Sequence, residues 1–260
     1  MRAPVDYAIA DVHGRADLLL PLVVACVEDA AARGSDARFT FLGDVIDRGP
    51  RSRDCLDMVC EVMRKKEGSA LLMGNHEQLA SRVLTEDAPE DADVVRWFAQ
   101  GGEATLASYH PDPETAFEAF RTLYPHHLDH MASARSSLVR KGFFLAHAGV
   151  NPDRPFGVQH DRDLLWVRDD FLDHVGYMEM PVIHGHSVVG DLPVVTENRI
   201  SIDTGAYVSG RLTACVLDGG APRFLQTDGS GRRVVSVEPV RLDRGLGTCL
   251  DAGEPLRLAA

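Results

Sequence analysis

Short apolar runs alternate with longer stretches of helical periodicity through the first part of the sequence. This alternation is typical of a parallel α/β arrangement, in which each helix carries the chain from one strand to the next. Buried strands are expected at 5–10, 38–42 and 70–73, and helices at 17–33 and 51–66. Each expected helix is followed by a glycine, the residue that most readily ends a helix.

Residues 76–135 depart from this alternation. Aromatic side chains recur there at helical spacings, between acidic, proline-containing breaks at 86–93 and 111–114. Such spacing predicts amphipathic helices whose aromatic faces form a local core. We therefore expect a helical, cap-like insertion at about 85–135. The aromatic residues concerned are Trp97, Phe98, Phe117, Phe120 and Tyr124.

Three histidines near the end of this segment, His126, His127 and His130, invite interpretation as a metal site. No partner motif accompanies them. We therefore expect exposed residues of a helix end or a loop.

From residue 137 on, short apolar runs are separated by glycine, asparagine and aspartate. This is the pattern of a β-meander, and it predicts a second, mostly antiparallel sheet. The runs lie at 138–139, 143–146, 182–183, 194–195, 199–202, 212–217 and 223–225. The stretch that begins at Arg241 carries no chemical signal that we can interpret.

The composition limits the size and the partners of the protein. A chain of 260 residues is near the upper end for one hydrophobic core, so we expect one domain, 1–260, that includes the helical insertion. The net charge of −12 argues against nucleic-acid or anionic-membrane partners, which need a basic face. A phosphate-bearing substrate is compatible with this charge, because bound divalent metals reverse the local sign in a cleft.

The cysteine content indicates a reducing environment. The sequence has five cysteines and no Cys-x-x-Cys pair, so neither a disulfide framework nor a thiolate zinc site is indicated. We expect reduced, buried thiols.

No signal peptide precedes the first motif, and no apolar stretch is long enough to span a bilayer. These observations together predict a cytoplasmic protein.

Five short motifs with carboxylate, amide or imidazole groups lie mostly just after the predicted strands. They read DVHG from Asp11, GDVIDRG from Gly43, GNHE from Gly74, HAG from His147 and HGH from His184. Strand ends from distant parts of one sheet converge in space, so such residues can assemble a single site. A turn cap or a core residue explains any one motif equally well, but not the whole set in this order.

The potential metal ligands exceed what one tetrahedral ion needs. Asp11 and His13 are two positions apart and point the same way if strand geometry continues through them. Asp44 has two carboxylate oxygens and can bridge two ions. The set therefore indicates a two-metal site, with ions about 3.5–4 Å apart. Its members are Asp11, His13, Asp44, Asn75, His147 and His186.

Two arginines and one histidine suit the handling of a phosphoryl group. The guanidinium groups of Arg48 and Arg168 offer a planar fork that matches phosphate oxygens. His76, beside Asn75, could protonate a leaving alkoxide. Asp47 could orient this ring and raise its proton affinity. If a metal-bound water attacks phosphorus directly, no cysteine or serine nucleophile is needed. This agrees with the cysteines, none of which lies in one of the five motifs.

With these motifs, the chain resembles the calcineurin-like metallophosphoesterases, and more narrowly the bacterial and phage members of the serine/threonine phosphoprotein phosphatase (PPP) family. Two further stretches look similar, LWVR from Leu165 and IDTGA from Ile202. The likeness covers 5–217, and 85–135 is its least constrained part. The full set of motifs is highly specific to the superfamily and less specific to protein substrates.

The resemblance implies an α/β fold of two mixed β-sheets packed as a sandwich and flanked by helices, with the metals at the strand ends. It implies that Asp11, His13 and Asp44 hold one ion and that Asp44 bridges to a second. His184 has no settled role, and we expect it behind the ligands. The other ligands of the second ion would be Asn75, His147 and His186.

The same resemblance places Arg48, Arg168 and Asn75 on the substrate phosphoryl group. It makes His76 the general acid, assisted by Asp47. The family often uses manganese, and iron or zinc is also found. The ligand set does not choose among these metals.

We therefore expect a metal-dependent phosphoesterase. The preferred hypothesis is a protein serine/threonine phosphatase in which a metal-bridging hydroxide attacks phosphorus directly. The alternative is a hydrolase of diadenosine tetraphosphate (symmetrical) or another nucleotide, because that family shares much of the motif set. Glu77 looks closer to the protein phosphatases, since the dinucleotide-cleaving relatives more often carry aspartate there.

A non-catalytic metal-binding scaffold is the third alternative. A binding module would not need His76, Arg48 and Arg168 together with every ligand, so we disfavour it. The expected partner is a phosphorylated protein or a small phosphoester. The sequence does not reveal the physiological substrate, the native metal, the oligomeric state or the role of residues 85–135.

Overall fold

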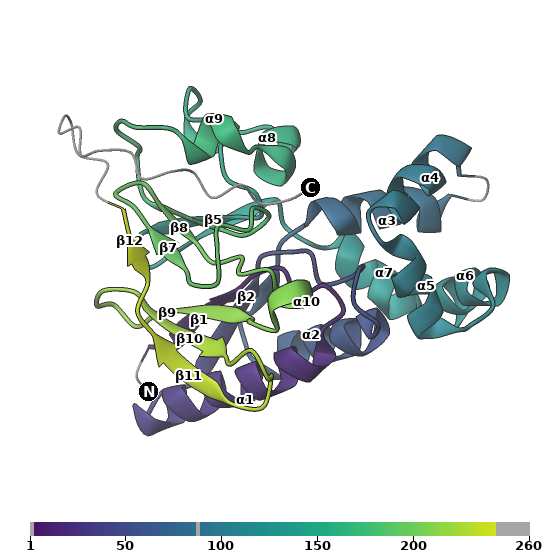
Figure 1. Cartoon of the computed structure of the whole chain (residues 1–260), viewed down its shortest axis with the longest axis horizontal. Coiled ribbons are helices and arrows are strands. Elements are labelled where there is room, and N and C mark those ends of the chain that lie inside the picture. The colour runs from purple at the N-terminus through teal and green to yellow at the C-terminus, as the bar shows by residue number, and fades with distance from the viewer. Residues whose placement is uncertain (1–2, 87–88, 243–260) are drawn as a thin grey trace.

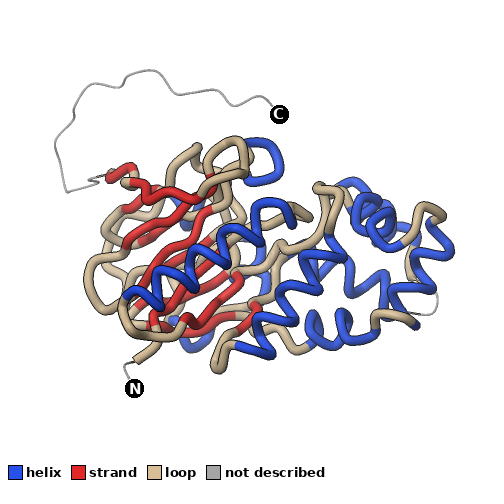
Figure 2. The backbone as a smooth tube through the Cα atoms, turned by 90° about the horizontal axis from the view of Figure 1, so that it is seen from below, coloured by secondary structure: helices blue, strands red, loops and turns tan. Residues whose placement is uncertain are grey.

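Two six-stranded β-sheets lie face to face, and helices cover the outer side of each (Figure 1). The computed structural model describes residues 3–86 and 89–242. A group of short helices extends from one end of the sheets (Figure 2). This is the α/β architecture of two mixed, packed sheets that the resemblance to the metallophosphoesterases implies.

The first sheet holds the predicted parallel start of the chain. Strands β1 (Val5–Ile9), β2 (Ala37–Phe41) and β3 (Ala70–Leu71) run parallel and side by side. Helices α1 (Ala16–Ala32) and α2 (Ser52–Lys65) connect them, as expected. Apolar side chains of these strands and helices form a continuous core, whose buried members include Tyr7, Leu18, Leu22, Phe39 and Leu56.

Three later strands complete this sheet beside β1. Strand β9 (Thr213–Leu217) pairs antiparallel with β1, β10 (Arg223–Thr227) with β9, and β11 (Val234–Val237) with β10. The prediction that the runs at 212–217 and 223–225 belong to the second sheet is therefore wrong. Alternation along a run shows that a strand exists, whereas its pairing partner depends on contacts distant in sequence.

The second sheet is mixed rather than mostly antiparallel, which corrects the expected β-meander. Its strands are β4 (Ser137–Arg140), β5 (Phe143–Ala146), β6 (Val182–His184), β7 (Val194–Val195), β8 (Arg199–Ser201) and β12 (Val240–Arg241). Pairs β5–β6, β6–β8 and β7–β12 are parallel, and pairs β4–β5 and β7–β8 are antiparallel. The long connection between β5 and β6 returns the chain to the same end of the sheet, so the two strands run parallel.

Apolar side chains fill the space between the sheets and the outer side of the second one. Ile183 and Phe224 belong to the layer between the sheets. Helices α8 (Asp161–Trp166) and α9 (Asp169–Leu172), preceded by the 3-10 turn η1 (Phe156–Val158), cover the outer side of the second sheet (Figure 1).

The helical segment beside the sheets is formed by α3 to α7 (Figure 1). Its helices are α3 (Asn75–Thr85), α4 (Asp91–Ala99), α5 (Gly102–Tyr109), α6 (Pro113–Thr122) and α7 (Pro125–Ala132). The helical interpretation of this stretch is confirmed, although the helices begin ten residues earlier than the expected 85. Trp97 and Phe120 are buried here, as the aromatic spacing predicts.

His127 is buried, which corrects the expectation of an exposed histidine. Its ring contacts the hydroxyl of Tyr109 at 2.6 Å and Asp57 at 3.1 Å. His126 is exposed and His130 is partly exposed. A helix of this length can present either side to its neighbours, so the sequence does not show which histidine faces the core.

The cysteines of the described chain are free, and three of them, Cys26, Cys55 and Cys215, are buried, as expected. Cys60 is partly exposed. Cys249 lies outside the described residues, as does almost all of the stretch from Arg241 on. Among the helices described within 3–86 and 89–242, none is long and apolar enough to cross a membrane.

Candidate active site

The predicted motifs meet where strands of both sheets end. Asp11 follows β1, Asp44 follows β2, and Asn75 begins α3 shortly after β3. In the second sheet, His147 follows β5 and His186 follows β6. The backbone N–H of His186 donates to both oxygens of Asp11 at 3.0 Å, although 175 positions separate the two residues. The two sheets thus contribute to one site.

The backbone turns sharply at these positions. Asp11, His13, Asp44 and His186 have φ values of 46°, 45°, 51° and 63°, in the left-handed region. This conformation costs a non-glycine residue about 1–3 kcal/mol and persists where the surroundings hold it. The expectation that strand geometry continues from Asp11 to His13 is therefore wrong. The side chains of Asp11 and His13 are therefore directed into the site by turns of the backbone and not by an extended strand.

Two glycines allow the strand ends to approach so closely. A Cβ atom at Gly185 would overlap the carboxylate of Asp11. A Cβ atom at Gly74 would overlap the backbone and side chain of Asp44. Any larger residue at either position would displace a carboxylate of the site.

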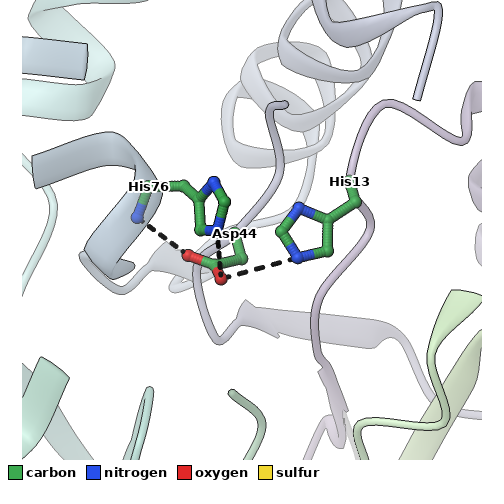
Figure 3. Close-up of side chains that lie close together, drawn as sticks. All are labelled: His13, Asp44 and His76. Carbon is green, nitrogen blue, oxygen red and sulfur yellow. Dashed lines mark hydrogen bonds and ion pairs between the residues drawn. The ribbon is translucent and has the colours of Figure 1, made fainter. Parts of the chain in front are cut away.

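Two groups of potential ligand atoms share Asp44. His13, Asp44 and His76 form one group, and Asp44, His147 and His186 form the other, with the ligand atoms of each within 4.8 Å of one another. Figure 3 shows the first group, in which both rings approach the Asp44 carboxylate. Oδ2 of Asp44 lies 3.6 Å from Nε2 of His13 and 3.7 Å from Nε2 of His76.

The second group converges on the side-chain oxygen of Asn75. Nε2 of His147 and Nδ1 of His186 each lie 2.8 Å from this oxygen. The two ring nitrogens are 3.2 Å apart, and Nε2 of His147 is 3.4 Å from Oδ1 of Asp44. Four side chains therefore point into one small volume.

The ring hydrogen bonds of two histidines, one in each group, leave an unshared electron pair directed at the Asp44 carboxylate. Nδ1 of His13 donates to the carbonyl of Ile46, and Nδ1 of His147 donates to the carbonyl of Leu42. A neutral imidazole carries one ring proton, so Nε2 of each ring is an acceptor. Nδ1 of His186 faces Asn75 and His147, whereas its Nε2 is buried and has no hydrogen-bond partner among the described residues. Acceptors that face one another repel, and cations between them would remove the repulsion.

The ionisation of the site agrees with this donor set. Burial lowers the pKa of His13 to about 3 and that of His186 to about 2, so both rings are neutral at pH 7. Burial raises the pKa of Asp11 well above its usual range, and the charges of Asp203 and Asp44 raise it further. Three buried carboxylates and several neutral imidazoles fit a pair of divalent ions. Asp11 itself belongs to neither of the two groups described above.

His76 is held by two charged neighbours. Its Nδ1–H donates to Oδ2 of Asp47 at 2.7 Å, and its Nε2 accepts from Nη2 of Arg48 at 3.2 Å. Burial by itself would lower the pKa of His76. The charges of Asp44 and Asp47 and the hydrogen bond to Asp47 outweigh burial, so the pKa is raised. Asp47 thus lies where it can orient the ring.

The helical segment supports Asp47, a contribution that sequence reasoning missed. The indole N–H of Trp97 donates to the two Asp47 oxygens at 3.1 and 3.0 Å. The hydroxyl of Thr105 donates to Oδ1 of Asp47 at 2.6 Å. A buried tryptophan needs a partner for its N–H group, but the sequence does not show which partner it finds.

The two candidate phosphate-binding arginines have different surroundings. The guanidinium of Arg48 lies 4.6 Å from the ring centroid of Tyr207, at the start of α10 (Ala206–Ser209). Arg168 is exposed and lines an open hollow of about 510 Å³ together with Trp166. Trp166 packs edge-on against His186, with ring centroids 6.3 Å apart, so this hollow borders the site. Tyr207 has no signal in the sequence that would single it out.

Glu77 and His184 lie outside both ligand groups. The Glu77 carboxylate accepts hydrogen bonds of 2.8 Å from the backbone N–H groups of Asp44 and Val45, so it fixes the loop that carries Asp44. His184 accepts a hydrogen bond of 2.7 Å from the hydroxyl of Ser201. Its other ring nitrogen donates to the backbone, so it is saturated without a metal ion.

Comparison with known proteins identifies a family match. Residues 7–204 match the protein family described as calcineurin-like phosphoesterase. Serine/threonine-protein phosphatase 2 of Salmonella typhimurium (strain LT2) is 29% identical over 217 residues, which cover 80% of this chain and 90% of that protein. The asymmetrical bis(5'-nucleosyl)-tetraphosphatase PrpE of Bacillus mycoides (strain KBAB4) is 28% identical over 230 residues, covering 79% of this chain and 87% of that protein.

Solved structures show the same fold. The crystal structure of a candidate diadenosine tetraphosphatase superposes with a TM-score of 0.59 at 16% identity, over 86% of this chain and 93% of that one. At this identity the likeness supports the arrangement of two sheets with flanking helices, and it carries no argument about the substrate.

Proposed function

This chain belongs to the calcineurin-like phosphoesterase family, and on that basis we propose that it is a metal-dependent protein serine/threonine phosphatase. It would hydrolyse phosphomonoesters and release phosphate and the free hydroxyl group. The likeness to serine/threonine-protein phosphatase 2, which extends over 90% of that protein, supports a protein substrate.

In this proposal Asp11, His13 and Asp44 would hold one divalent ion, and Asp44 would also be a ligand of a second. When bound, the two ions would supply Lewis acidity and a water molecule of lowered pKa as the nucleophile. Mixed oxygen and nitrogen ligands suit manganese, iron or zinc. The other ligands of the second ion would be Asn75, His147 and His186, whose side chains lie close together.

The position of His76 is the observation that carries the proposal. Its ring lies between the shared ligand Asp44 and the carboxylate of Asp47, which accepts the Nδ1 proton. Nε2 therefore faces the ligand groups, where a substrate oxygen would leave. A phosphate group would draw the guanidinium of Arg48 onto its own oxygens, which frees Nε2 of His76. The raised pKa of His76 favours uptake of a second ring proton at Nε2, and this proton would pass to the leaving oxygen.

Three further side chains would position the phosphoryl group. Tyr207 stacks on the Arg48 guanidinium and limits its movement. Arg168 at the rim and the side chain of Asn75 would bind the remaining phosphoryl oxygens.

A nucleotide is the second candidate substrate, and an arginine-rich hollow favours it. The hollow has a volume of about 570 Å³, and its lining includes Arg82, Arg96, Arg162 and Trp166. The guanidinium of Arg96 lies 5.1 Å from the centroid of the Trp166 ring. Cations beside an aromatic face suit a polyphosphate joined to a base. The likeness to the tetraphosphatase PrpE agrees with this candidate.

Hydrolysis of a phosphopeptide panel beside diadenosine tetraphosphate separates the two candidates. Metal-stripped protein is refilled with manganese, iron or zinc, one metal at a time. We expect a higher kcat/KM for phosphoserine or phosphothreonine peptides than for the dinucleotide. A higher value for the dinucleotide with every metal would overturn the protein-phosphatase proposal.

The arginine-rich hollow gives a second test of substrate class. If the substrate is a nucleotide, replacing Arg82 and Arg162 by alanine should raise the KM for the dinucleotide about tenfold or more, because phosphate contacts are lost. The kcat/KM for p-nitrophenyl phosphate, which is too small to reach the hollow, should stay unchanged. Arg232→Ala, at an exposed position, is the matched control. An unchanged KM for the dinucleotide would remove the support that this hollow gives to the second candidate.

A further inference from the structure

A second cluster of metal-binding side chains lies between α2 and α7. It consists of Asp57 on α2 and His126 and His127 on α7, with ligand atoms that all lie within 4.8 Å of one another. The cluster shares no residue with the two active-site groups. We propose that Asp57, His126 and His127 bind a Zn²⁺ ion that clamps α7 to α2.

The spacing of the three side chains is close to what zinc requires. Oδ1 of Asp57 lies 3.1 Å from Nε2 of His127 and 3.9 Å from Nε2 of His126. A tetrahedral zinc ion with bonds of about 2.0–2.2 Å holds its ligand atoms roughly 3.3 Å apart. Small side-chain rotations would therefore complete the site, and the backbone of the two helices would stay in place.

Tyr109 orients the ring of His127. The Tyr109 hydroxyl lies 2.6 Å from Nδ1 of His127, and both residues are buried. When the hydroxyl oxygen accepts the Nδ1 proton, Nε2 presents its unshared electron pair toward Asp57. A hydrogen-bonded partner on the far ring nitrogen is typical of zinc-bound histidine. Burial lowers the pKa of His127 to about 4, so the ring is neutral at pH 7.

The site is open on one side, which lets an ion enter. The side chains of His126 and Asp57 are 51% and 49% exposed, whereas that of His127 is 0% exposed. His126 and Asp57 line a hollow of about 550 Å³ that also contains Cys60 and His130. His130 is four residues after His126 on the same helix face, so either this ring or a water molecule can be the fourth ligand.

The chemical types of the three side-chain donors favour zinc over other divalent ions. Two imidazoles and one carboxylate suit zinc, whereas calcium and magnesium prefer sites made of oxygen ligands. The neighbouring cation Arg64 is paired with Glu61 at 2.8 Å, so its charge is compensated.

The clamp would strengthen the helices that support the active site. Helix α5 carries Tyr109, which contacts His127, and Thr105, which donates to Asp47. These two residues are four positions apart and lie on one face of the helix. Zinc would thus hold the helical segment against α2 without taking part in the reaction.

The test measures zinc bound to the full chain. Metal-stripped wild type, Asp57→Asn and His126→Ala are equilibrated with Zn²⁺, and zinc per chain is measured by mass spectrometry of the metal. We expect each variant to hold one zinc ion fewer than the wild type. His110→Ala, at an exposed histidine of the same helical segment, should keep the wild-type number. Equal zinc content in the wild type and both variants would overturn the proposal.

Two further measurements separate this site from the active site. The first repeats the zinc measurement in proteins that also carry Asp44→Asn, which changes the residue shared by the two active-site groups. The His126→Ala variant should still hold one zinc ion fewer than the protein with His126. Zn²⁺ should also raise the thermal midpoint of the wild type more than that of His126→Ala, since a metal that binds the native state stabilises it. Identical zinc-induced shifts in the two proteins would contradict the clamp. Loss of phosphatase activity plays no part in either readout.

Discussion

Asp44 shows how much of the candidate active site depends on one side chain. Its oxygens lie 3.6 Å from His13, 3.7 Å from His76 and 3.4 Å from His147. Glu77 accepts a hydrogen bond from the backbone N–H of Asp44, and the backbone N–H of His76 donates to Oδ1 of Asp44 at 3.1 Å, so both the backbone and the carboxylate are held. A carboxylate with acceptors on both sides is placed to share two cations.

Replacing His76 by asparagine should slow hydrolysis in a way that depends on the leaving group. A serine alkoxide needs a proton as it leaves, so kcat for a phosphoserine peptide should fall about 10²–10⁴-fold. The loss should be much smaller for p-nitrophenyl phosphate, whose leaving group is a weak base. Steady-state kinetics with both substrates measure the difference, and His110→Asn is the control. Equal losses for the two substrates would contradict a general-acid role.

Cys60 should react slowly with thiol reagents at neutral pH. Burial, together with the negative charge of Asp57, raises its pKa to about 12. Because the thiolate is the reactive form, alkylation of the folded protein should be slow at pH 7 and should accelerate as the pH rises toward 12. Mass spectrometry after iodoacetamide treatment, with urea-unfolded protein as the control, follows the reaction. Rapid labelling of native Cys60 at pH 7 would show that the thiol is not shielded.

The helical segment contributes to the candidate active site through several of its helices. Helix α3 begins with Asn75 and His76, so its first turn carries one proposed ligand and the proposed acid. Helices α4 and α5 supply Trp97 and Thr105, which donate to Asp47. The segment therefore positions the proposed proton donor, in addition to any contact with the substrate.

Trp97→Phe tests this support. The change keeps an aromatic ring and removes the N–H group that contacts both Asp47 oxygens. Hydrogen bonds to a charged group contribute about 1.5–3 kcal/mol, so kcat should fall roughly 10-fold or more. The KM should change little, because Trp97 acts through Asp47 and His76. Val95→Ala, at a side chain that is 67% exposed on the same helix, is the control. An unchanged kcat would show that Asp47 needs no such support.

The packing of the two sheets concentrates negative charge in the interior. Asp11, Asp44 and Asp203 are all buried near the strand ends. Carboxylates this close together repel one another unless cations lie between them. The stability of the fold should therefore depend on the bound metal.

Chelation should lower the thermal midpoint. A ligand present at 100 times its dissociation constant stabilises the native state by about 2.7 kcal/mol, which corresponds to roughly 5–10 °C for a domain of this size. Calorimetry before and after metal removal measures the shift, and excess Mn²⁺ should restore the original midpoint. The shift should also occur in His126→Ala, which separates it from zinc bound between α2 and α7. Identical midpoints with and without metal would mean that the buried carboxylates are compensated by protons.

Local properties of the chain were sufficient for much of this description. The observed limits of β1, β2, β7, α1 and α2 are within one residue of those predicted from periodicity. Periodicity and helix ends depend on neighbouring residues, which a sequence displays directly. The metal-binding character of the motifs also follows from residue types, and the family match agrees with it. The roles of the individual site residues, the manganese preference and the cytoplasmic location stay predictions.

Contacts between distant residues account for what the sequence did not reveal. The pairing of β9 with β1, the parallel course of β5 and β6, and the burial of His127 depend on which surfaces pack together. The same holds for Trp97, Thr105 and Tyr207, whose side chains would be ordinary core or surface residues in another fold. An apolar period marks the face that must be covered, but it carries no information about which part of the chain covers it.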